Sequence, residues 1–278
     1  MPGLRIGFIG AGSMVGAIVR GAAAAGRDTS GFLLTSAGGA SARALAQEIG
    51  AAPCQSNDEL VASADMVVLG VKPHAVPGVL DELATPLAEH SPLVVSLAAG
   101  LSLARLEGLA PAGTRIVRAM PNIAAGVGQS MTALAPGTPV SAQDLEAVED
   151  LMGAVGRTVV LADKDFPAFV GLAGSSPAFV LTFIDALARA GVLGGIPRAQ
   201  AVEIVTQAVL GTARLLQAEA DSEAAQGRPR TPADLIDAVC SPGGTTVAGV
   251  VALQRAGFSD AVVRAFEATV ARDRELGA

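Results

Sequence analysis

The residues best suited to chemistry near the start of the chain form a glycine-rich turn. Ile6–Ile9 is typical of a buried strand, and residues 14–25 have a helical pattern. Glycines at positions 10 and 12 between such elements let the backbone approach a pyrophosphate, whose charge then meets the N–H groups of the following helix. The pattern Gly-x-Gly-x-x-Gly is only partly kept because Val15 holds its third glycine position. A similar turn without a nucleotide is the alternative.

The end of the second predicted strand, residues 31–35, indicates which nicotinamide dinucleotide binds. NAD-binding folds carry an acidic residue about 20 positions after the glycines, which bonds the ribose 2′-hydroxyl. Here the strand ends in Thr35 and Ser36, so no carboxylate repels a 2′-phosphate. Arg43 follows within one or two helical turns and suits a phosphate. We therefore expect NADPH to be preferred, with NAD as the alternative cofactor and an ordinary polar loop as the blander interpretation.

Polar residues also follow later predicted strands, at the edge where doubly wound sheets bind ligands. Asn57, at a capped helix start, is expected to face the cofactor. Lys72 lies at the carboxyl end of the apolar run 65–71, and Asn122 follows the run 114–120. A solvated loop lysine and a turn-forming asparagine are the alternatives for these two side chains.

Composition excludes several classes of function. The 278-residue chain has a net charge of -7 and only 3% aromatic residues, so it lacks the basic surface and stacking platforms of nucleic-acid binding. Two histidines offer neither a metal cluster nor a histidine-centred acid–base pair. Two distant cysteines and a start without a charged leader favour the reducing cytoplasm. Residues 119–143 and 166–184 lack charge but contain proline and glycine, which predicts buried segments rather than membrane spans.

The second half of the chain has helical signals throughout, and residues 221–230 form its one expected mobile connection. An interruption at residues 240–246 holds two glycines and three hydroxyl residues. Such a break leaves backbone N–H groups available to a carboxylate or phosphate, although a plain interhelical turn has the same composition. Helices are expected at residues 178–189, 197–219, 232–239 and 247–255.

The chain resembles the pyrroline-5-carboxylate reductase family in motifs that follow one another in order along its whole length. The most specific of them is residues 232–254, PADLIDAVCSPGGTTVAGVVALQ, which is similar to the family signature. The glycine turn is less specific, since many dehydrogenases share it. Shorter matches are residues 71–73 (VKP), 96–100 (SLAAG), 118–122 (RAMPN) and 181–188 (LTFIDALA).

This resemblance implies both the fold and the reaction. The expected fold class is α/β, with a Rossmann-type doubly wound parallel sheet over residues 1–162 and an all-α domain for dimerisation and substrate binding over residues 163–278. Strand–helix alternation in the first half favours a parallel sheet independently. The implied activity is NAD(P)H-dependent reduction of 1-pyrroline-5-carboxylate to L-proline, the last step of proline biosynthesis. The family forms dimers that often assemble into decamers. For this chain we expect an obligate homodimer, because residues 166–184 are too apolar to lie on a surface.

Position-by-position matching of this chain to the family adds cofactor and substrate contacts to those expected from the residues themselves. The source of the imine proton stays open between Thr246, solvent and the substrate. A family glutamate falls at Lys164, between two aspartates, so an acidic contact to the substrate amine also stays open. The cofactor candidates are Gly10, Ala11, Gly12, Ser13, Met14, Thr35, Ser36, Asn57, Val71, Lys72, Pro73, Ala98, Ala99 and Asn122. The substrate candidates are Ser241, Gly243, Gly244, Thr245 and Thr246, with Thr246 as the catalytic candidate.

Two other functions are compatible with these residues. A reductase acting on a larger ring, such as a six-membered cyclic imino acid, would need the same cofactor site and the same carboxylate receptor. A dinucleotide-sensing protein without catalytic activity would keep the fold, because a fold does not determine a function. Turnover of five- and six-membered imines with NADPH distinguishes the three.

Overall fold

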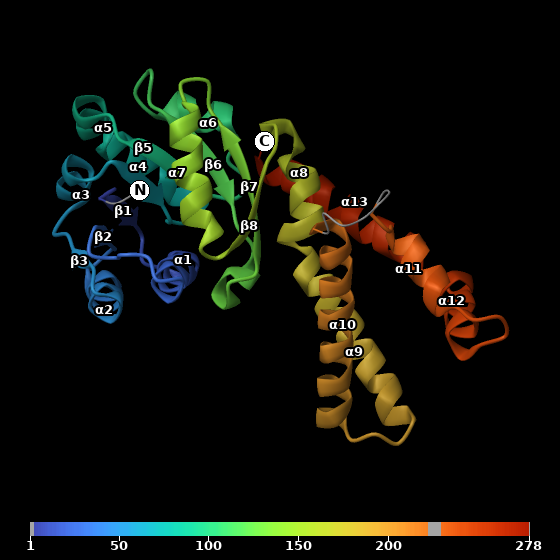
Figure 1. Ribbon diagram of the computed structural model, residues 1–278. Coiled ribbons are helices and arrows are strands. Elements are labelled where there is room, and N and C mark those ends of the chain that lie inside the picture. Colours follow the sequence, from blue (N-terminus) through green and yellow to red (C-terminus); the bar gives the residue numbers. More distant parts are fainter. Residues whose placement is uncertain (1–2, 222–228, 278) are drawn as a thin grey trace. The chain divides into compact units, whose positions relative to one another are not determined.

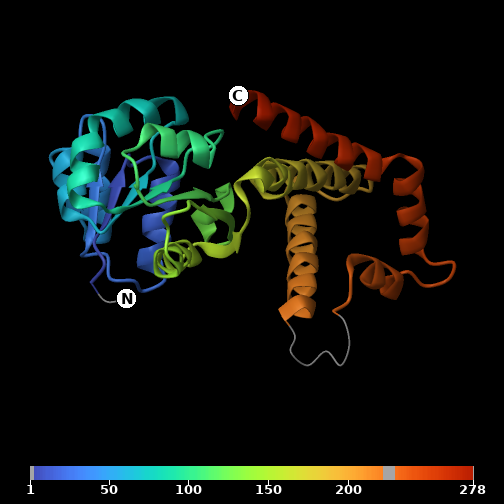
Figure 2. The same cartoon turned by 90° about the horizontal axis from the view of Figure 1, so that it is seen from above.

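Eight strands form one sheet in the computed structural model, which describes residues 3–221 and 229–277. Their order across the sheet is β3-β2-β1-β4-β5-β6-β7-β8, and helices lie on both faces (Figures 1 and 2). The strands are β1 (Ile6–Ile9), β2 (Phe32–Thr35), β3 (Ala52–Pro53), β4 (Met66–Leu69), β5 (Leu93–Ser96), β6 (Ile116–Met120), β7 (Ser130–Pro136) and β8 (Gly156–Val160).

The strand order reverses beside β1, which pairs in parallel with β2 on one side and with β4 on the other. From β1 the chain moves outward through β2 to β3, and it then returns to place β4 against the free edge of β1. The connections after β1 and β4 therefore leave the sheet in opposite directions. Such a switch point opens a crevice at the carboxyl ends of the two strands, where doubly wound sheets bind their ligands.

The sheet is mostly parallel, as predicted, and within the described residues its one antiparallel pair is formed by β6 and β7. β7 runs antiparallel to β6, and β8 then pairs in parallel with β7. The chain joins β6 to β7 through a short connection containing one 3-10 turn, Ile123–Val127. A parallel crossover needs about a dozen residues or more, so this short connection can only reverse the chain direction.

Alternating side chains of the strands supply two cores, one on each face of the sheet. On β1, Phe8 packs beside Phe32 with ring centres 5.2 Å apart, whereas Ile9 belongs to the core on the opposite face. This alternation follows from the two-residue period of a strand. The helices of this half are α1 (Ser13–Ala24), α2 (Ala40–Ile49), α3 (Asn57–Ser63), α4 (Val76–Glu82), α5 (Ala84–His90), α6 (Leu103–Leu109) and α7 (Ala142–Gly153).

The second half is helical, as predicted. Its helices are α8 (Phe166–Phe169), α9 (Ser176–Leu193), α10 (Arg198–Asp221), α11 (Pro232–Val239), α12 (Thr245–Arg255) and α13 (Phe258–Gly277). Of these, α13 had no counterpart among the predicted helices, and Figure 2 shows it as one uninterrupted helix. Residues 222–228 of the predicted mobile connection lie outside the described residues.

The chain divides into two compact units. One contains Met1–Ser175 together with Ala268–Ala278, and the other contains Ser176–Glu267. The C-terminal end of α13 thus belongs with the sheet, although its sequence follows the helical half. The boundary between residues 162 and 163, which separates the expected dinucleotide-binding domain from the expected helical domain, remains a prediction.

Asn122 connects the end of β6 to the helical segment that follows the sheet. A π-helical turn, Val170–Gly174, joins α8 to α9. Pro177 has no N–H to donate to the carbonyl of Ala173, four residues earlier. The Nδ2 of Asn122 donates to that carbonyl at 3.0 Å, and its Oδ1 accepts from the N–H of Ala124 at 3.1 Å. Asn122 therefore has a structural task beside the cofactor contact expected of it.

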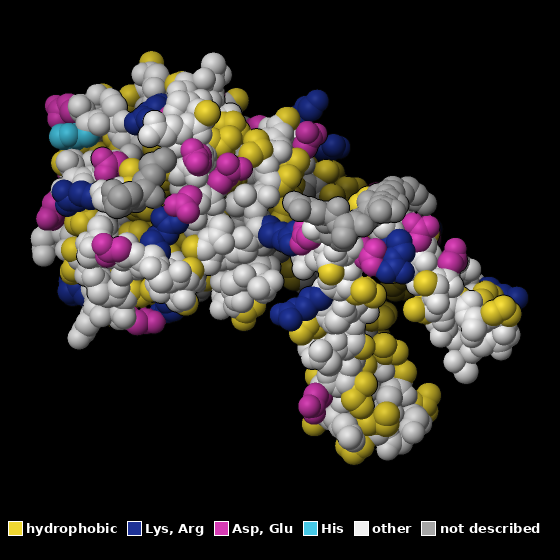
Figure 3. All heavy atoms as spheres, in the orientation of Figure 1, with side chains coloured by type: hydrophobic (Ala, Val, Ile, Leu, Met, Phe, Trp, Pro, Cys, Tyr) yellow, Lys and Arg dark blue, Asp and Glu magenta, His cyan; other side chains and the backbone are white. Residues whose placement is uncertain are grey.

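The expectation that residues 166–184 are buried is wrong for most of this segment within a single chain. Phe166, Phe169 and Val170 are buried, but Leu181 is 64% exposed and Phe183 is 37% exposed. Asp163–Leu193 forms a helical stretch long and apolar enough to cross a membrane by length and composition, and little of it is buried. Figure 3 shows hydrophobic side chains gathered over α9 and α10. An apolar surface of this extent marks an interface.

Candidate active site

Gly10 and Gly70 join the carboxyl ends of β1 and β4 at the switch point. Gly10 has a φ of +97°, in the region that favours glycine. A Cβ added there would lie 3.0 Å from the carbonyl carbon and oxygen of Gly70. The N–H of Gly70 donates to the carbonyl of Ile9 at 2.8 Å. The two strand ends therefore approach each other too closely for any side chain at position 10.

Val15 stands at the third glycine position of the dinucleotide-binding pattern, and Gly70 supplies the space that it needs. In that pattern the third glycine permits close packing of the helix on the sheet. Val15 is completely buried, and a Cβ added to Gly70 would lie 2.1 Å from its Cγ2. The glycine that permits close packing is therefore Gly70, at the end of β4, and not the residue at position 15 of α1. Valine at position 15 thus leaves the close packing of α1 on the sheet intact.

The N-terminus of α1 is arranged to receive an anion. Its N-cap is Gly12, no side chain caps it, and no acidic residue occupies its first turn. A Cβ on Gly12 would meet no atom within 4 Å, so open space lies in front of the helix end. The first N–H groups, from Ser13 and Met14 onward, point into this space with the positive end of the helix dipole behind them. A pyrophosphate fits this arrangement.

A cavity of about 610 Å³ extends from this turn across the ends of β2 and β4. The Oγ1 of Thr35 donates to the Oδ1 of Asn57 at 2.7 Å. This buried hydroxyl therefore orients the asparagine side chain. The Oγ of Ser36 accepts from the N–H of Ala42 at 3.1 Å and caps α2 from outside the helix. Of the predicted cofactor contacts, the cavity brings together Gly10, Thr35, Ser36, Asn57 and Val71.

The turn after β2 offers donors without a carboxylate. Gly38 and Gly39 both have positive φ, +73° and +71°. The guanidinium of Arg43 lies over this turn, since a Cβ on Gly39 would be 2.6 Å from its Nη1. Cys54 lines the same cavity. Burial, followed by the nearby carboxylate of Glu59, raises the pKa of its thiol, so the neutral form predominates at neutral pH.

The remaining cofactor candidates lie at the ends of β4 and β5, which are neighbours in the sheet. Lys72 is exposed and precedes a 3-10 turn that begins with Pro73. After β5, the Oγ of buried Ser96 accepts from the N–H of Ala98 at 3.3 Å, and Ala99 is exposed. Val71 lines the 610 Å³ cavity, but Lys72, Pro73, Ala98 and Ala99 are not among its lining residues. These four residues lie beyond the switch point, on the side where the sheet continues toward β6.

The predicted substrate loop belongs to the other compact unit. Its backbone turns at Gly243, which has a φ of +68°, and the N–H of Gly244 donates to the carbonyl of Ser241 at 3.0 Å. Gly244 is the N-cap of α12, and no side chain caps this end. Thr245 and Thr246 are exposed in the first turn of the helix. Both predicted anion receptors are thus helix ends that begin with a glycine and have no side-chain cap.

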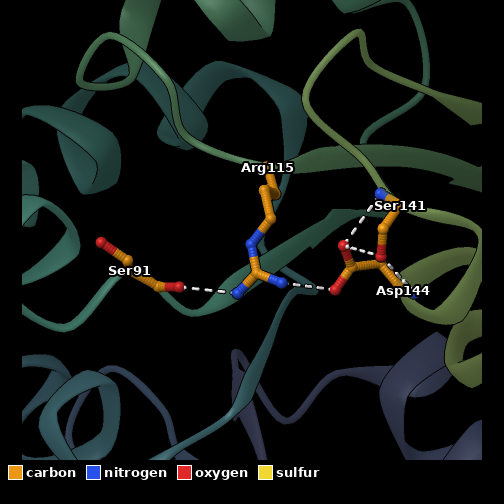
Figure 4. Close-up of polar contacts among 4 residues, drawn as sticks. All are labelled: Ser91, Arg115, Ser141 and Asp144. Atoms are coloured by element: carbon orange, nitrogen blue, oxygen red, sulfur yellow. Dashed lines mark hydrogen bonds and ion pairs between the residues drawn. The ribbon is translucent and has the colours of Figure 1, made fainter.

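A second cavity, of about 320 Å³, lies at the amino ends of the strands and has a different character. There Arg115, just before β6, donates from Nη1 to Asp144 at 2.5 Å and from Nη2 to the carbonyl of Ser91 at 2.8 Å (Figure 4). Asp144 also forms a capping box with Ser141 at the start of α7. These groups satisfy one another, so their arrangement secures the amino ends of the strands rather than presenting charge to a ligand.

Gly70, Gly38 and Gly39 are the site residues that the sequence analysis missed. Gly70 follows the last residue of β4. The valine at the third glycine position was the signal for it, because a small residue must then lie opposite Val15. The turn at Gly38 and Gly39 was noted only for its lack of a carboxylate. Among residues 3–221 and 229–277, no group of three or more histidine, cysteine or acidic residues is placed to hold a metal ion.

Comparison with known proteins assigns the chain to a family. Residues 163–276 match a family described as pyrroline-5-carboxylate reductase dimerisation, and residues 5–100 match one described as NADP oxidoreductase coenzyme F420-dependent. A pyrroline-5-carboxylate reductase of Pisum sativum is 38% identical over 98% of this chain and 95% of its own length. The chain belongs to the pyrroline-5-carboxylate reductase family.

Solved structures of similar proteins agree with this assignment over the whole chain. A pyrroline-5-carboxylate reductase from Coxiella burnetii has a TM-score of 0.91 and 31% identity and covers 99% of both chains. The enzyme from Plasmodium falciparum, solved with NADP bound, has a TM-score of 0.84 and 27% identity over the full length of both. This reductase accordingly has an N-terminal NADP-binding domain and a helical dimerisation domain, and it is a homo-oligomer.

Proposed function

We propose that this enzyme reduces 1-pyrroline-5-carboxylate to L-proline with NADPH, as the last step of proline biosynthesis. The observation that carries the proposal is the coexistence, in one chain, of a dinucleotide site at the β1/β4 switch point and the family's dimerisation domain with its 240–246 loop. Relatives named for this activity match nearly the whole chain. When bound, NADPH supplies the hydride that reduces the C=N carbon.

The preference for NADPH rests on the turn after β2. Ser36, the backbone of Gly38 and Gly39, and Arg43 surround the place where a 2′-phosphate would lie, and none of them is acidic. Arg43 is exposed on α2 and lies over the turn without an intervening side chain. A guanidinium binds phosphate oxygens through two parallel N–H donors, which a ribose hydroxyl of NADH cannot match.

The substrate side of the proposal uses the loop before α12. Gly243, Gly244 and the first N–H groups of the helix would receive the carboxylate, and the hydroxyls of Ser241 and Thr245 lie in the same exposed loop. Thr246 would direct its hydroxyl to the ring nitrogen. A protonated imine is already electrophilic, so its reduction needs no strong acid; its proton comes from Thr246, from solvent or with the substrate. Positioning of the imine against the cofactor then accounts for most of the acceleration.

Assembly and location form part of the same proposal. The dimer is obligate, because the exposed apolar surface of α9 and α10 is too large for a stable free chain in water, and dimers assemble further into decamers. Cys54 and Cys240 are both free thiols, which suits the reducing cytoplasm.

Steady-state kinetics test this proposal. Wild-type enzyme should oxidise NADPH with 1-pyrroline-5-carboxylate at a higher kcat/KM than NADH, and the six-membered imine should be the poorer substrate. Ser36→Asp should reverse the cofactor preference by placing a carboxylate beside the 2′-phosphate. Faster turnover of the larger ring would favour the cyclic imino acid alternative. No oxidation with either ring, despite tight NADPH binding, would favour a dinucleotide sensor.

A further inference from the structure

Arg118 is a buried charge within the sheet, two residues before β6 ends. Its side chain is only 5% exposed, and its Nη1 donates to the Oδ1 of Asp163 at 2.8 Å. The guanidinium carbon also lies 4.1 Å from the centre of the Phe166 ring. Within the described residues, its buried Nε has no hydrogen-bond acceptor. A buried ion pair contributes little net stability to a core, because both charges lose their hydration on burial.

Asp163 links Arg118 to the start of helix α6. Its second carboxylate oxygen, Oδ2, accepts from the N–H of Leu103 at 3.0 Å. Leu103 is the first residue of α6, and the N-cap of that helix, Ser102, accepts from the N–H of Arg105 at 3.2 Å. One carboxylate therefore connects β6, the start of α6 and the segment that leads to α8.

The loop between β5 and α6, residues 97–102, is held at several points along its length. At its start the Oγ of Ser96 accepts from the N–H of Ala98. In the middle, Gly100 has a φ of +77°, and a Cβ there would be 3.6 Å from the carbonyl oxygen of Leu276 on α13. At its end the backbone passes to Asp163 through Leu103. Ala99, which by its match to the family faces the nicotinamide half of the cofactor, lies within this short loop next to Ala98.

We propose that Arg118 is a positioning residue that, through Asp163, sets the backbone of the 97–102 loop against the nicotinamide end of the cofactor. The inference rests on the proposed NADPH-dependent reduction. Arg118 also lies beside the start of the loop, since it pairs in register with Ser96, the last residue of β5. A misplacement of about 1 Å at a reacting centre is sufficient to slow a reaction severely, so a charge retained in this position controls geometry rather than stability.

Arg115 provides a control of the same residue type, with a side chain that is 37% exposed against 5% for Arg118. It adjoins the same strand and also pairs with an aspartate that serves a helix N-terminus, but at the amino ends of the strands. Loss of Arg115 should affect folding stability in the same general way and leave the hydride-transfer geometry unchanged. Arg118→Met and Arg115→Met both remove one guanidinium and keep most of the apolar length of the side chain.

The experiment measures kcat, KM for NADPH, the Kd of NADPH and the isotope effect with NADPH deuterated at the transferred position, using the full-length assembled enzyme. Arg118→Met should lower kcat by about tenfold or more, change the Kd and KM for NADPH by less than about threefold, and raise the isotope effect because hydride transfer becomes more strongly rate-limiting. Arg118→Lys should recover part of kcat, since one ammonium can still pair with Asp163. Arg115→Met should resemble the wild type in kcat and isotope effect.

Asp163→Asn decides the matter if Arg118→Met fails to fold. Its amide oxygen still accepts from Leu103 while the charge is lost, so kcat should fall and the isotope effect should rise without weaker NADPH binding. A folded Arg118→Met, or Asp163→Asn in its place, with wild-type kcat and isotope effect would overturn the inference while an active wild type upholds the proposed function. An equal loss of kcat in Arg115→Met would also overturn it. A wild type that reduces no cyclic imine would overturn both.

Discussion

At the scale of single residues, Thr246 is the side chain to which the proposal gives a direct contact with the substrate. It lies in the first turn of α12 after two glycines, and we propose that its hydroxyl meets the ring nitrogen while backbone N–H groups hold the carboxylate. Thr246→Val keeps the shape and removes the hydroxyl. It should lower kcat/KM for the imine by about 5- to 150-fold, the equivalent of one hydrogen bond worth about 1 to 3 kcal/mol.

The control for Thr246 is the neighbouring threonine. If Thr245 offers chiefly its backbone N–H, Thr245→Ala should have a mild effect. NADPH affinity, measured by fluorescence titration, should be nearly unchanged in both variants. Full activity in Thr246→Val, or an equal loss of cofactor binding, would mean that the 241–246 loop is not the substrate receptor.

The contact between Val15 and Gly70 gives a second prediction at residue scale. Gly70→Ala would place a methyl group 2.1 Å from the Cγ2 of Val15 and 3.2 Å from the carbonyl oxygen of Gly10. Overpacking of this kind costs about 1 to 3 kcal/mol, so the midpoint of urea unfolding should fall. Adding Val15→Ala should restore part of the lost stability, because it removes the Val15 methyl group that the new methyl group at position 70 would otherwise overlap. Purely additive losses in the double variant, at fixed protein concentration, would contradict this account.

At the scale of elements, Asp185 joins the two long helices α9 and α10. It accepts a hydrogen bond from the Nε of Arg189, four residues along α9, at 2.8 Å, and another from Arg198 at the start of α10. The bond from Arg189, and then that from Arg198, lowers the pKa of Asp185 below its ordinary value of 3.8. Because the folded-state pKa is the lower one, the ionised carboxylate stabilises the helix pair above pH 3.8.

This stabilisation should be lost as the pH falls below 3.8 through the lowered folded-state pKa. Asp185→Asn should reduce thermal stability modestly at neutral pH and flatten the dependence of stability on pH in that acidic range, as followed by circular dichroism. The change is small because these groups are exposed to solvent. Asp81→Asn, which removes an exposed carboxylate from α4, serves as the control. If Asp185→Asn had the same dependence of stability on pH as the wild type, Asp185 would not stabilise the pair of helices α9 and α10 as expected.

At the scale of the whole molecule, the apolar surface of the helical unit determines whether the protein exists as a free chain. A cavity of about 480 Å³ in this unit is lined almost entirely by apolar side chains, including Phe179, Phe183 and Leu187 of α9 and Phe258 and Val262 of α13. Their exposure in a single chain indicates that a second copy covers them. The family's dimerisation domain spans the same residues.

Leu187→Glu should therefore weaken assembly and abolish most activity. Light scattering should find wild-type protein as a dimer or a multiple of it at micromolar concentration, and the variant should show a smaller or aggregated species. Ala104→Glu, on an exposed position of α6, introduces the same charge on the sheet unit and should leave the assembly intact. A folded and active wild-type monomer would contradict the obligate dimer.

Local chemistry is what the sequence by itself determined. The glycine turn, the apolar strands and the capped helix starts follow short-range rules, and the structure reproduces them as β1, α1, β4 and α11 within one or two residues. The signature at residues 232–254 indicated the family, because its motif needs no knowledge of the fold. The missing carboxylate after β2 and the interrupted helix before α12 were also visible, since each is a property of a few consecutive residues.

Only the tertiary structure decided which distant residues share a task. The antiparallel direction of β7, the space that Gly70 leaves for Val15, and the bond from Asn122 to Ala173 all depend on how elements pack across the chain. The same holds for the pair of Arg118 and Asp163, 45 positions apart. The apolar segment after Phe166 is the clearest case. Its composition indicated burial, but most of it stays exposed in a single chain, and a second subunit is the cover that we propose for it.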